Sequence, residues 1–267
     1  MKWIKRLLSA GGLLFGVGLI VLLLGILLGG SVSDVRFGGA LTFSGEYRGA
    51  VGVDIDLPAA NVTVTQGDVF EVRCYNLPQD FFSVSVKNNI VRVRQEEVRW
   101  REYLSVKGVP RLEITCPAST TLDRIRVRTA VGKTSVDGVY VKQITVKTGV
   151  GAIAAENVVS LGTKLDIGLG GIVAAGSLSG ENVLHCGAGY IHAVVLGDPA
   201  AYGVQMDNAL GMLRFNEDGY SGFGNDLALP GSGTDRFDIQ CTVGKGVLEL
   251  YPPDDLEELA GQYGAAL

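Results

Sequence analysis

The stretch that decides the fold is a repeat with a period of 19 residues. It reads IRVRTAVGKTSVDGVYVKQ (125–143), ITVKTGVGAIAAENVVSLG (144–162), TKLDIGLGGIVAAGSLSGE (163–181) and NVLHCGAGYIHAV (182–194). A glycine recurs at one place in every copy, as Gly132, Gly151, Gly170 and Gly189. A fixed period of this length is typical of architectures in which one structural unit stacks on the next.

Within each copy, apolar residues alternate before the glycine, which predicts a β-strand. Polar or small pairs then close the unit, namely Asp137-Gly138, Glu156-Asn157 and Ala175-Gly176. One copy has a single apolar face, so it needs neighbours about 4.8 Å away to bury that face. We therefore predict an all-β fold, a parallel single-stranded β-solenoid (β-helix) with rungs of about 19 residues. Parallel crossovers favour a right-handed coil.

The period also predicts which side chains are neighbours. Asp166 and His185 fall in one outward column, one rung apart. With no serine or cysteine nucleophile in reach, they indicate a surface ladder rather than a catalytic pair. His192 shares its column with Ser135, Ala154 and Val173, which offer it no partner.

The motif returns around Gly211 and Gly244, at longer intervals. Read in chain order, these copies put Cys186 and Cys241 two rungs apart, too far for a disulfide, with Asn208 facing inward between them. The interval between the two glycines predicts a loop that leaves one face. Because insertions in repeat folds gather on binding faces, this loop is the candidate partner site, and a structural loop without a ligand is the alternative. Its candidate residues are Glu217, Asp218, Tyr220, Phe223, Asn225 and Asp226.

Residues 1–30 predict a short cytoplasmic stub and a transmembrane anchor. Lys2, Lys5 and Arg6 precede an uncharged, mostly apolar run from Leu7 to Gly30. A helix of that length spans a bilayer, and the positive charges keep its start in the cytoplasm. We expect a single-pass protein of the cell membrane with its C-terminal domain outside the cytoplasm. A cleaved signal peptide is the alternative, although its apolar region would have only ~7–15 residues.

The rest of the chain divides by pattern. Residues 31–49 are expected to form a tether, 50–120 an N-terminal β-strand part, 121–251 the repeat solenoid and 252–267 an acidic tail or cap. Asn88-Asn89 separates two alternating runs and predicts a tight hairpin, because asparagine tolerates positive φ.

Composition excludes several classes of function. The net charge of −5 argues against nucleic acid as a partner. Four cysteines without CxxC spacing are neither a disulfide framework nor a zinc site, and whether Cys74 and Cys116 pair stays open. No catalytic constellation, metal site or cofactor site can be assembled, so we expect no enzyme and no cofactor.

Several longer pieces carry a family resemblance: VDIDLPAANVTVTQGD (53–68), LEITCPASTTLDRIRVRTAVGKTSVDG (112–138), GFGND (222–226) and FDIQCTVGKGVLEL (237–250). Together they resemble the bacterial putative-adhesin family of uncharacterised, membrane-anchored β-solenoid domains, over residues 50–251. The resemblance implies an extracytoplasmic repeat domain with no established enzymatic activity. The predicted anchor and the flat ladder faces of a solenoid favour a membrane-anchored, adhesin-like surface or interaction protein without catalytic activity, whose expected partner is a cell surface, a glycan or a protein. An envelope-stress or signalling accessory protein that acts through a membrane partner is the alternative. A polysaccharide-acting β-helix enzyme is a third reading. The oligomeric state is left open.

Overall fold

A computed structural model describes residues 40–96 and 108–252 of the chain. These residues form two short 3₁₀ turns, η2 (Gln79–Phe81) and η3 (Pro199–Ala201). The remaining elements are strands: β1 (Leu41–Glu46), β2 (Gly52–Asp56), β3 (Asn61–Gly67), β4 (Glu71–Tyr75), β5 (Phe82–Lys87), β6 (Ile90–Gln95), β7 (Arg111–Pro117), β8 (Leu122–Asp137), β9 (Tyr140–Leu196), β10 (Tyr202–Phe215), β11 (Asp218–Leu229) and β12 (Asp235–Tyr251).

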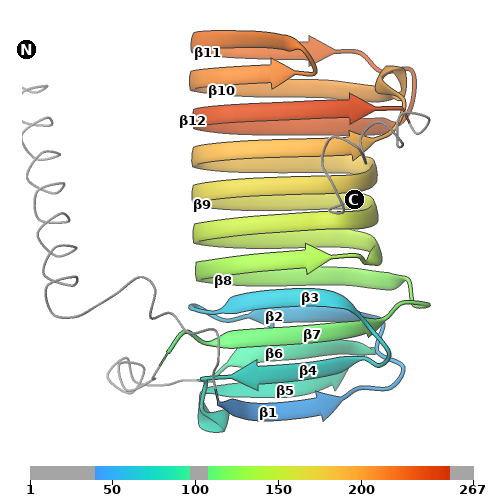
Figure 1. Ribbon diagram of the computed structural model, residues 1–267, viewed down its shortest axis with the longest axis vertical. Helices are drawn as coiled ribbons and strands as arrows, with labels where there is room; N and C mark the ends of the chain where they lie inside the picture. Colours follow the sequence, from blue (N-terminus) through green and yellow to red (C-terminus); the bar gives the residue numbers. More distant parts are fainter. Residues whose placement is uncertain (1–39, 97–107, 253–267) are drawn as a thin grey trace, which may run out of the picture. The chain divides into compact units, whose positions relative to one another are not determined.

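The strands form one mixed sheet, in the order β1-β4-β7-β3-β8-β9-β12-β10-β11, with β2, β6 and β5 branching from β8. The pairs β1–β4, β4–β7, β5–β6 and β10–β11 are antiparallel. The predicted fold class, a parallel single-stranded solenoid, is therefore wrong. Antiparallel pairs at both ends of the sheet add strands that the period of the central repeat does not reveal (Figure 1).

The sheet folds into two layers because β8 bends at Gly132. The first part of β8 pairs with β2, and the part after the bend pairs with β3. The apolar side chains between the layers are almost all fully buried, as at Val127, Val136 and Ile144. Hydrophobic burial between the layers is thus the main stabilising term of this unit.

The 19-residue register is present where β8 meets β9. Val127 pairs with Val146 and Thr129 with Thr148, so the predicted columns are confirmed there. The two threonine hydroxyls lie 3.1 Å apart inside the core and satisfy one another. Along β9 the offset continues, since the Ser179 hydroxyl donates to the carbonyl of Ser160, 19 residues earlier.

Strand β12 lies between β9 and β10, although it is the last strand in the chain. Cys241 consequently pairs with Cys186. The predicted separation of two rungs is wrong, because it assumed that strands stack in chain order. Asn208 lies on the far side of Cys241 rather than between the cysteines, and its side-chain amide donates to the carbonyl of Gly244 at 3.1 Å.

Other predictions have mixed outcomes. Asn88 and Asn89 both have positive φ and join β5 to β6, which confirms the hairpin. Part of the predicted tether forms strand β1 instead. Phe43 of this strand packs edge-on against Phe82, with the ring centroids 5.8 Å apart. No helix within residues 40–96 and 108–252 is long and apolar enough to cross a membrane. The predicted anchor and C-terminal cap fall outside the described residues.

Candidate functional site

A row of polar and charged side chains crosses the outer side of one layer, and we call it the charge ladder. The pairing of β6, β2, β8, β9, β12, β10 and β11 places its members side by side. Strand β9 contributes three of them, 19 residues apart, which are joined by ion pairs. In spatial order the ladder runs Arg94, Asp56, Arg128, Lys147, Asp166, His185, Gln240, Asp207 and Asp226.

The ladder is basic at the end formed by β6, β2 and β8. Five arginines from β6 and β8 surround two aspartates of β2. Asp54 is only 5% exposed and forms an ion pair with Arg94 at 2.8 Å. The Nε atoms of Arg92, Arg124 and Arg126 are buried and have no hydrogen-bond partner in the structure. These buried atoms are not available to a ligand, but the local excess of positive charge is suited to an anionic group.

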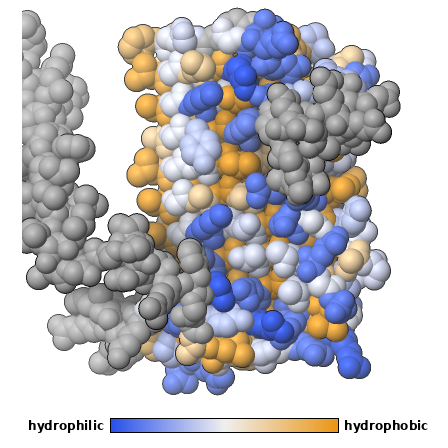
Figure 2. All heavy atoms as spheres, in the orientation of Figure 1, coloured by the Kyte–Doolittle hydropathy of each residue, from blue (hydrophilic) through white to orange (hydrophobic). Residues whose placement is uncertain are grey.

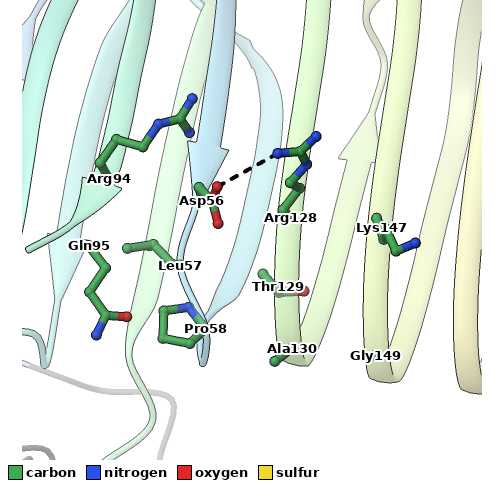
Figure 3. Close-up of a pocket in the computed structure, with 10 residues that line it drawn as sticks. All are labelled: Asp56, Leu57, Pro58, Arg94, Gln95, Arg128, Thr129, Ala130, Lys147 and Gly149. Carbon is green, nitrogen blue, oxygen red and sulfur yellow. Dashed lines mark ion pairs between the residues drawn. The ribbon is translucent and has the colours of Figure 1, made fainter.

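A hollow of about 660 Å³ opens at this end (Figure 3). Arg94, Asp56, Arg128 and Lys147 line one side of it, and Pro58, Ala130 and Gly149 are among the small or apolar residues that line the rest. Arg128 lies 3.9 Å from Asp56, a loose ion pair between half-exposed side chains. The lysine and arginine head groups are therefore accessible from solvent.

In the middle of the ladder, Asp166 lies between two basic side chains. Lys147 Nζ lies 3.0 Å from Asp166 Oδ2, and His185 Nδ1 lies 2.9 Å from Asp166 Oδ1, which confirms the predicted neighbours. Partial burial pushes the pKa of Asp166 upward, but the hydrogen bonds from His185 and Lys147 outweigh it and lower that pKa below its ordinary value. Each carboxylate oxygen of Asp166 thus has a basic partner, as is typical of ion pairs that stabilise a fold.

The predicted partner loop is a strand in the structure. Residues 218–229 form β11, which pairs antiparallel with β10, so the prediction of a loop is wrong. The strand turns from one layer to the other at a glycine with positive φ, as β8 does at Gly132, and we call such residues corner glycines. Gly222 pairs with Gly211 and is the corner glycine of β11, which explains the difference. A stretch rich in glycine and aspartate looks like a loop when only its composition is considered.

The candidate residues of that stretch do not all come together. Asn225 and Asp226 line a hollow of about 460 Å³ at the acidic end of the ladder, where Asp226 faces Asp207. Phe223 is 84% exposed at the corner, away from that hollow. Glu217 and Asp218 lie at the turn at the other end of β11. Of Tyr220 only the backbone is described, and it pairs with Leu213.

A second polar cluster lies where β9, β12 and β10 meet, and it was missed in the sequence. Glu249 is only 4% exposed. It accepts hydrogen bonds from the Arg214 guanidinium and, at 3.2 Å, from the Tyr251 hydroxyl. His192 Nε2 lies 3.8 Å from the same carboxylate, beyond hydrogen-bond distance, and has no hydrogen-bond partner among the described residues. This contact comes from β12 and not from the predicted column of Ser135, Ala154 and Val173. Only the insertion of β12 beside β9 brings Glu249 there.

All four cysteines are free and buried. Burial raises the pKa of the Cys116 and Cys241 thiols to about 12, so neither is a thiolate at neutral pH. Cys74 pairs with Leu112, four residues from Cys116 on β7, so these two thiols do not meet. Among the residues that the structure describes, no group of three or more His, Cys, Asp or Glu side chains is arranged to hold a metal ion.

The chain is distantly similar to several solved structures. No family model matches the chain, and no curated protein matches it. The chain is similar to a solved "putative cell adhesion protein" from Clostridium sporogenes, with 10% identity and a TM-score of 0.40 over 80% of this chain and 99% of that chain. It is also similar to a "putative adhesin" from Bacteroides fragilis (14% identity, TM-score 0.37, 81% and 98% covered) and one from Parabacteroides distasonis (13%, 0.36, 80% and 98%). Matches with scores this low show nothing about the function of this chain.

Proposed function

We propose that this chain is an adhesin-like surface protein that binds an acidic cell-surface polymer without catalysing a reaction. In this proposal residues 7–30 anchor the chain in the cell membrane and the strands lie outside the cytoplasm. The charge ladder carries the proposal, because it presents a continuous row of partly or fully exposed polar groups with an excess of arginine at one end.

The spacing of the ladder supports a polymeric partner. Neighbouring strands hold their side chains about 4.8 Å apart, so basic groups recur along a line rather than around a point. Arg94, Arg128 and Lys147 face one hollow from three strands. A polymer with repeated carboxylate or phosphate groups can engage several of them at once, and such multivalent binding is stronger than any single ion pair.

Charge reversal at Lys147 is expected to weaken binding of the full chain to polygalacturonate by roughly threefold to tenfold, as a charge pair of this exposure suggests. Binding would be measured by interferometry on immobilised polymer, with neutral dextran as the reference. Lys147 pairs with Asp166 and its side chain is 68% exposed.

The matched control is Lys142→Glu, because Lys142 is also on β9 and pairs with Asp123, with a side chain 59% exposed, outside the ladder. Equal losses in both variants would mean that only net charge matters and would contradict the ladder as the site. Failure of the unmodified chain to prefer polygalacturonate over dextran would contradict the proposed function, as would release of new reducing ends.

The location has its own test. Protease added outside intact cells is expected to degrade the strand domain while the chain stays in the membrane fraction. A shortened chain released into the medium would contradict the anchor and favour a cleaved signal peptide.

A further inference from the structure

A continuous row of apolar side chains lies along the corner where the two layers join, and we call it the apolar ridge. Strand pairing places its members side by side from β8 to β11. Figure 2 shows apolar residues in a column along the left edge of the coloured part of the molecule. The ridge consists of Val131, Val150, Leu169, Ala188, Val243, Leu210 and Phe223.

Core packing does not account for this row. Apart from Ala188, the exposed fractions of the ridge residues run from 41% at Leu210 to 84% at Phe223. Each ridge residue is the chain neighbour of a corner glycine with positive φ, where the chain passes from one layer to the other. A polar side chain would fit these exposed positions equally well. Seven apolar residues in line therefore indicate a surface that meets something apolar.

The surroundings of the ridge lack negative charge. The corner segments are 130–133, 149–152, 168–171, 187–190, 242–245, 209–212 and 221–224, and their charged residues are Lys133 and Lys245 alone. The chain as a whole has a net charge of −5, so carboxylates are concentrated elsewhere. The Tyr190 ring lies across Gly171 on the flank of the ridge, since a Cβ at Gly171 would lie 2.3 Å from it. Aliphatic, aromatic and lysine side chains together are typical of surfaces that meet lipid head groups.

The shape of the ridge favours a lipid surface over a second protein. The ridge is one residue wide and roughly 29 Å long, from seven positions about 4.8 Å apart. A stable protein interface engages about 20–30 residues on each side, which a convex corner of this width does not supply. A bilayer needs no matching groove, because its lipids rearrange around an inserted edge.

We propose that the apolar ridge docks edge-on into the interfacial layer of an anionic lipid bilayer, with Lys133 and Lys245 against the head groups. This rests on the membrane location proposed above and adds to it the edge of the folded unit that meets the lipid. The charge ladder and the ridge share no residue, and they adjoin at Ala130 and Gly149, which line the basic hollow.

The test labels single positions of the full chain in vesicles of phosphatidylcholine and phosphatidylglycerol in equal parts. An environment-sensitive fluorophore is attached through Leu169→Cys or Phe223→Cys on the ridge. The control position is Leu161→Cys, because Leu161 is also on β9 and 63% exposed, but lines a pocket with Lys142, Lys164 and Glu181. The native cysteines are buried and will not take the label. Flotation of the same samples reports membrane attachment separately.

Nitroxide groups on the lipid acyl chains are expected to quench the ridge labels several-fold more than the Leu161 label. Reversing the charge of both ridge lysines, with Lys133→Glu and Lys245→Glu together, should reduce the quenching of the ridge labels several-fold. The change Lys142→Glu should leave that quenching unchanged. Equal quenching at positions 161 and 169 in chains that float with the vesicles would contradict docking through the ridge, but it would not contradict attachment through the proposed anchor. Disulfide-linked dimers through the cysteine at position 169 would overturn it in favour of a second copy of the chain. Chains that do not float would contradict the membrane location itself.

Discussion

Replacing Gly170 by alanine is expected to destabilise the folded unit by more than ~3 kcal/mol, enough to remove most of the stability of a typical domain. Gly170 has φ of +139°, which costs an alanine about 1–3 kcal/mol in strain alone. An added Cβ would also lie 1.9 Å from the carbonyl oxygen of Gly151 in the adjacent rung. That oxygen is backbone and is held by the stack, so it cannot move away as a flexible side chain would.

The free energy of unfolding would be measured by circular dichroism in denaturant, on the full chain. Gly162→Ala is the matched control on the same strand, because its new Cβ would lie 3.7 Å from the carbonyl of Glu181 and its backbone is not in the positive-φ region. That control is expected to change stability by less than about 1 kcal/mol. Equal stability of the two variants would contradict the close stacking of the corners.

Much of the local structure could be predicted from the sequence because each rung repeats one pattern. The period placed Val127 beside Val146 and Asp166 beside His185, and the structure confirms both pairs. Burial fixes such a register strongly, since a shift of one residue would turn every core side chain outward. The columns of the charge ladder on β8 and β9 follow from the same argument.

The order of the strands could not be predicted in the same way. The segments that end at Gly211 and Gly244 carry equivalent patterns, so either could stack on the last rung of β9. Hydrophobic pattern determines which face of a strand is buried, but not which of two similar strands becomes its neighbour. The structure places β12 there, which brings Cys241 to Cys186 and Glu249 to His192. The second polar cluster was missed for this reason.

The candidate partner site was misread for a related reason. The long interval between Gly211 and Gly244 predicts a loop, yet Gly222 within it is a corner glycine of β11. Antiparallel pairing reverses the chain direction, so the 19-residue spacing cannot detect this copy of the corner. The exposed Phe223 then belongs to the apolar ridge rather than to a binding loop.

A carboxylate placed at Leu165 is expected to abolish cooperative folding at neutral pH. Leu165 is fully buried in the aliphatic column between the layers, where a charge has neither water nor a partner. Burial of an unpaired charge costs several kcal/mol, comparable to the whole stability of a domain. Unfolding of Leu165→Asp would be followed by circular dichroism across a range of pH.

The pH dependence identifies the cause of this loss. Desolvation raises the pKa of a buried carboxyl in the folded state above its unfolded value of about 3.9, so the neutral form is favoured on folding. The penalty in Leu165→Asp should therefore shrink as the pH falls toward about 4 and return as it rises. Leu161→Asp is the matched control four residues away, because Leu161 is exposed and lies in a hollow with Lys142 and Lys164. Its stability should stay close to that of the unmodified chain, while equal melting of both variants would place Leu165 at the surface and contradict the stacking of the aliphatic column.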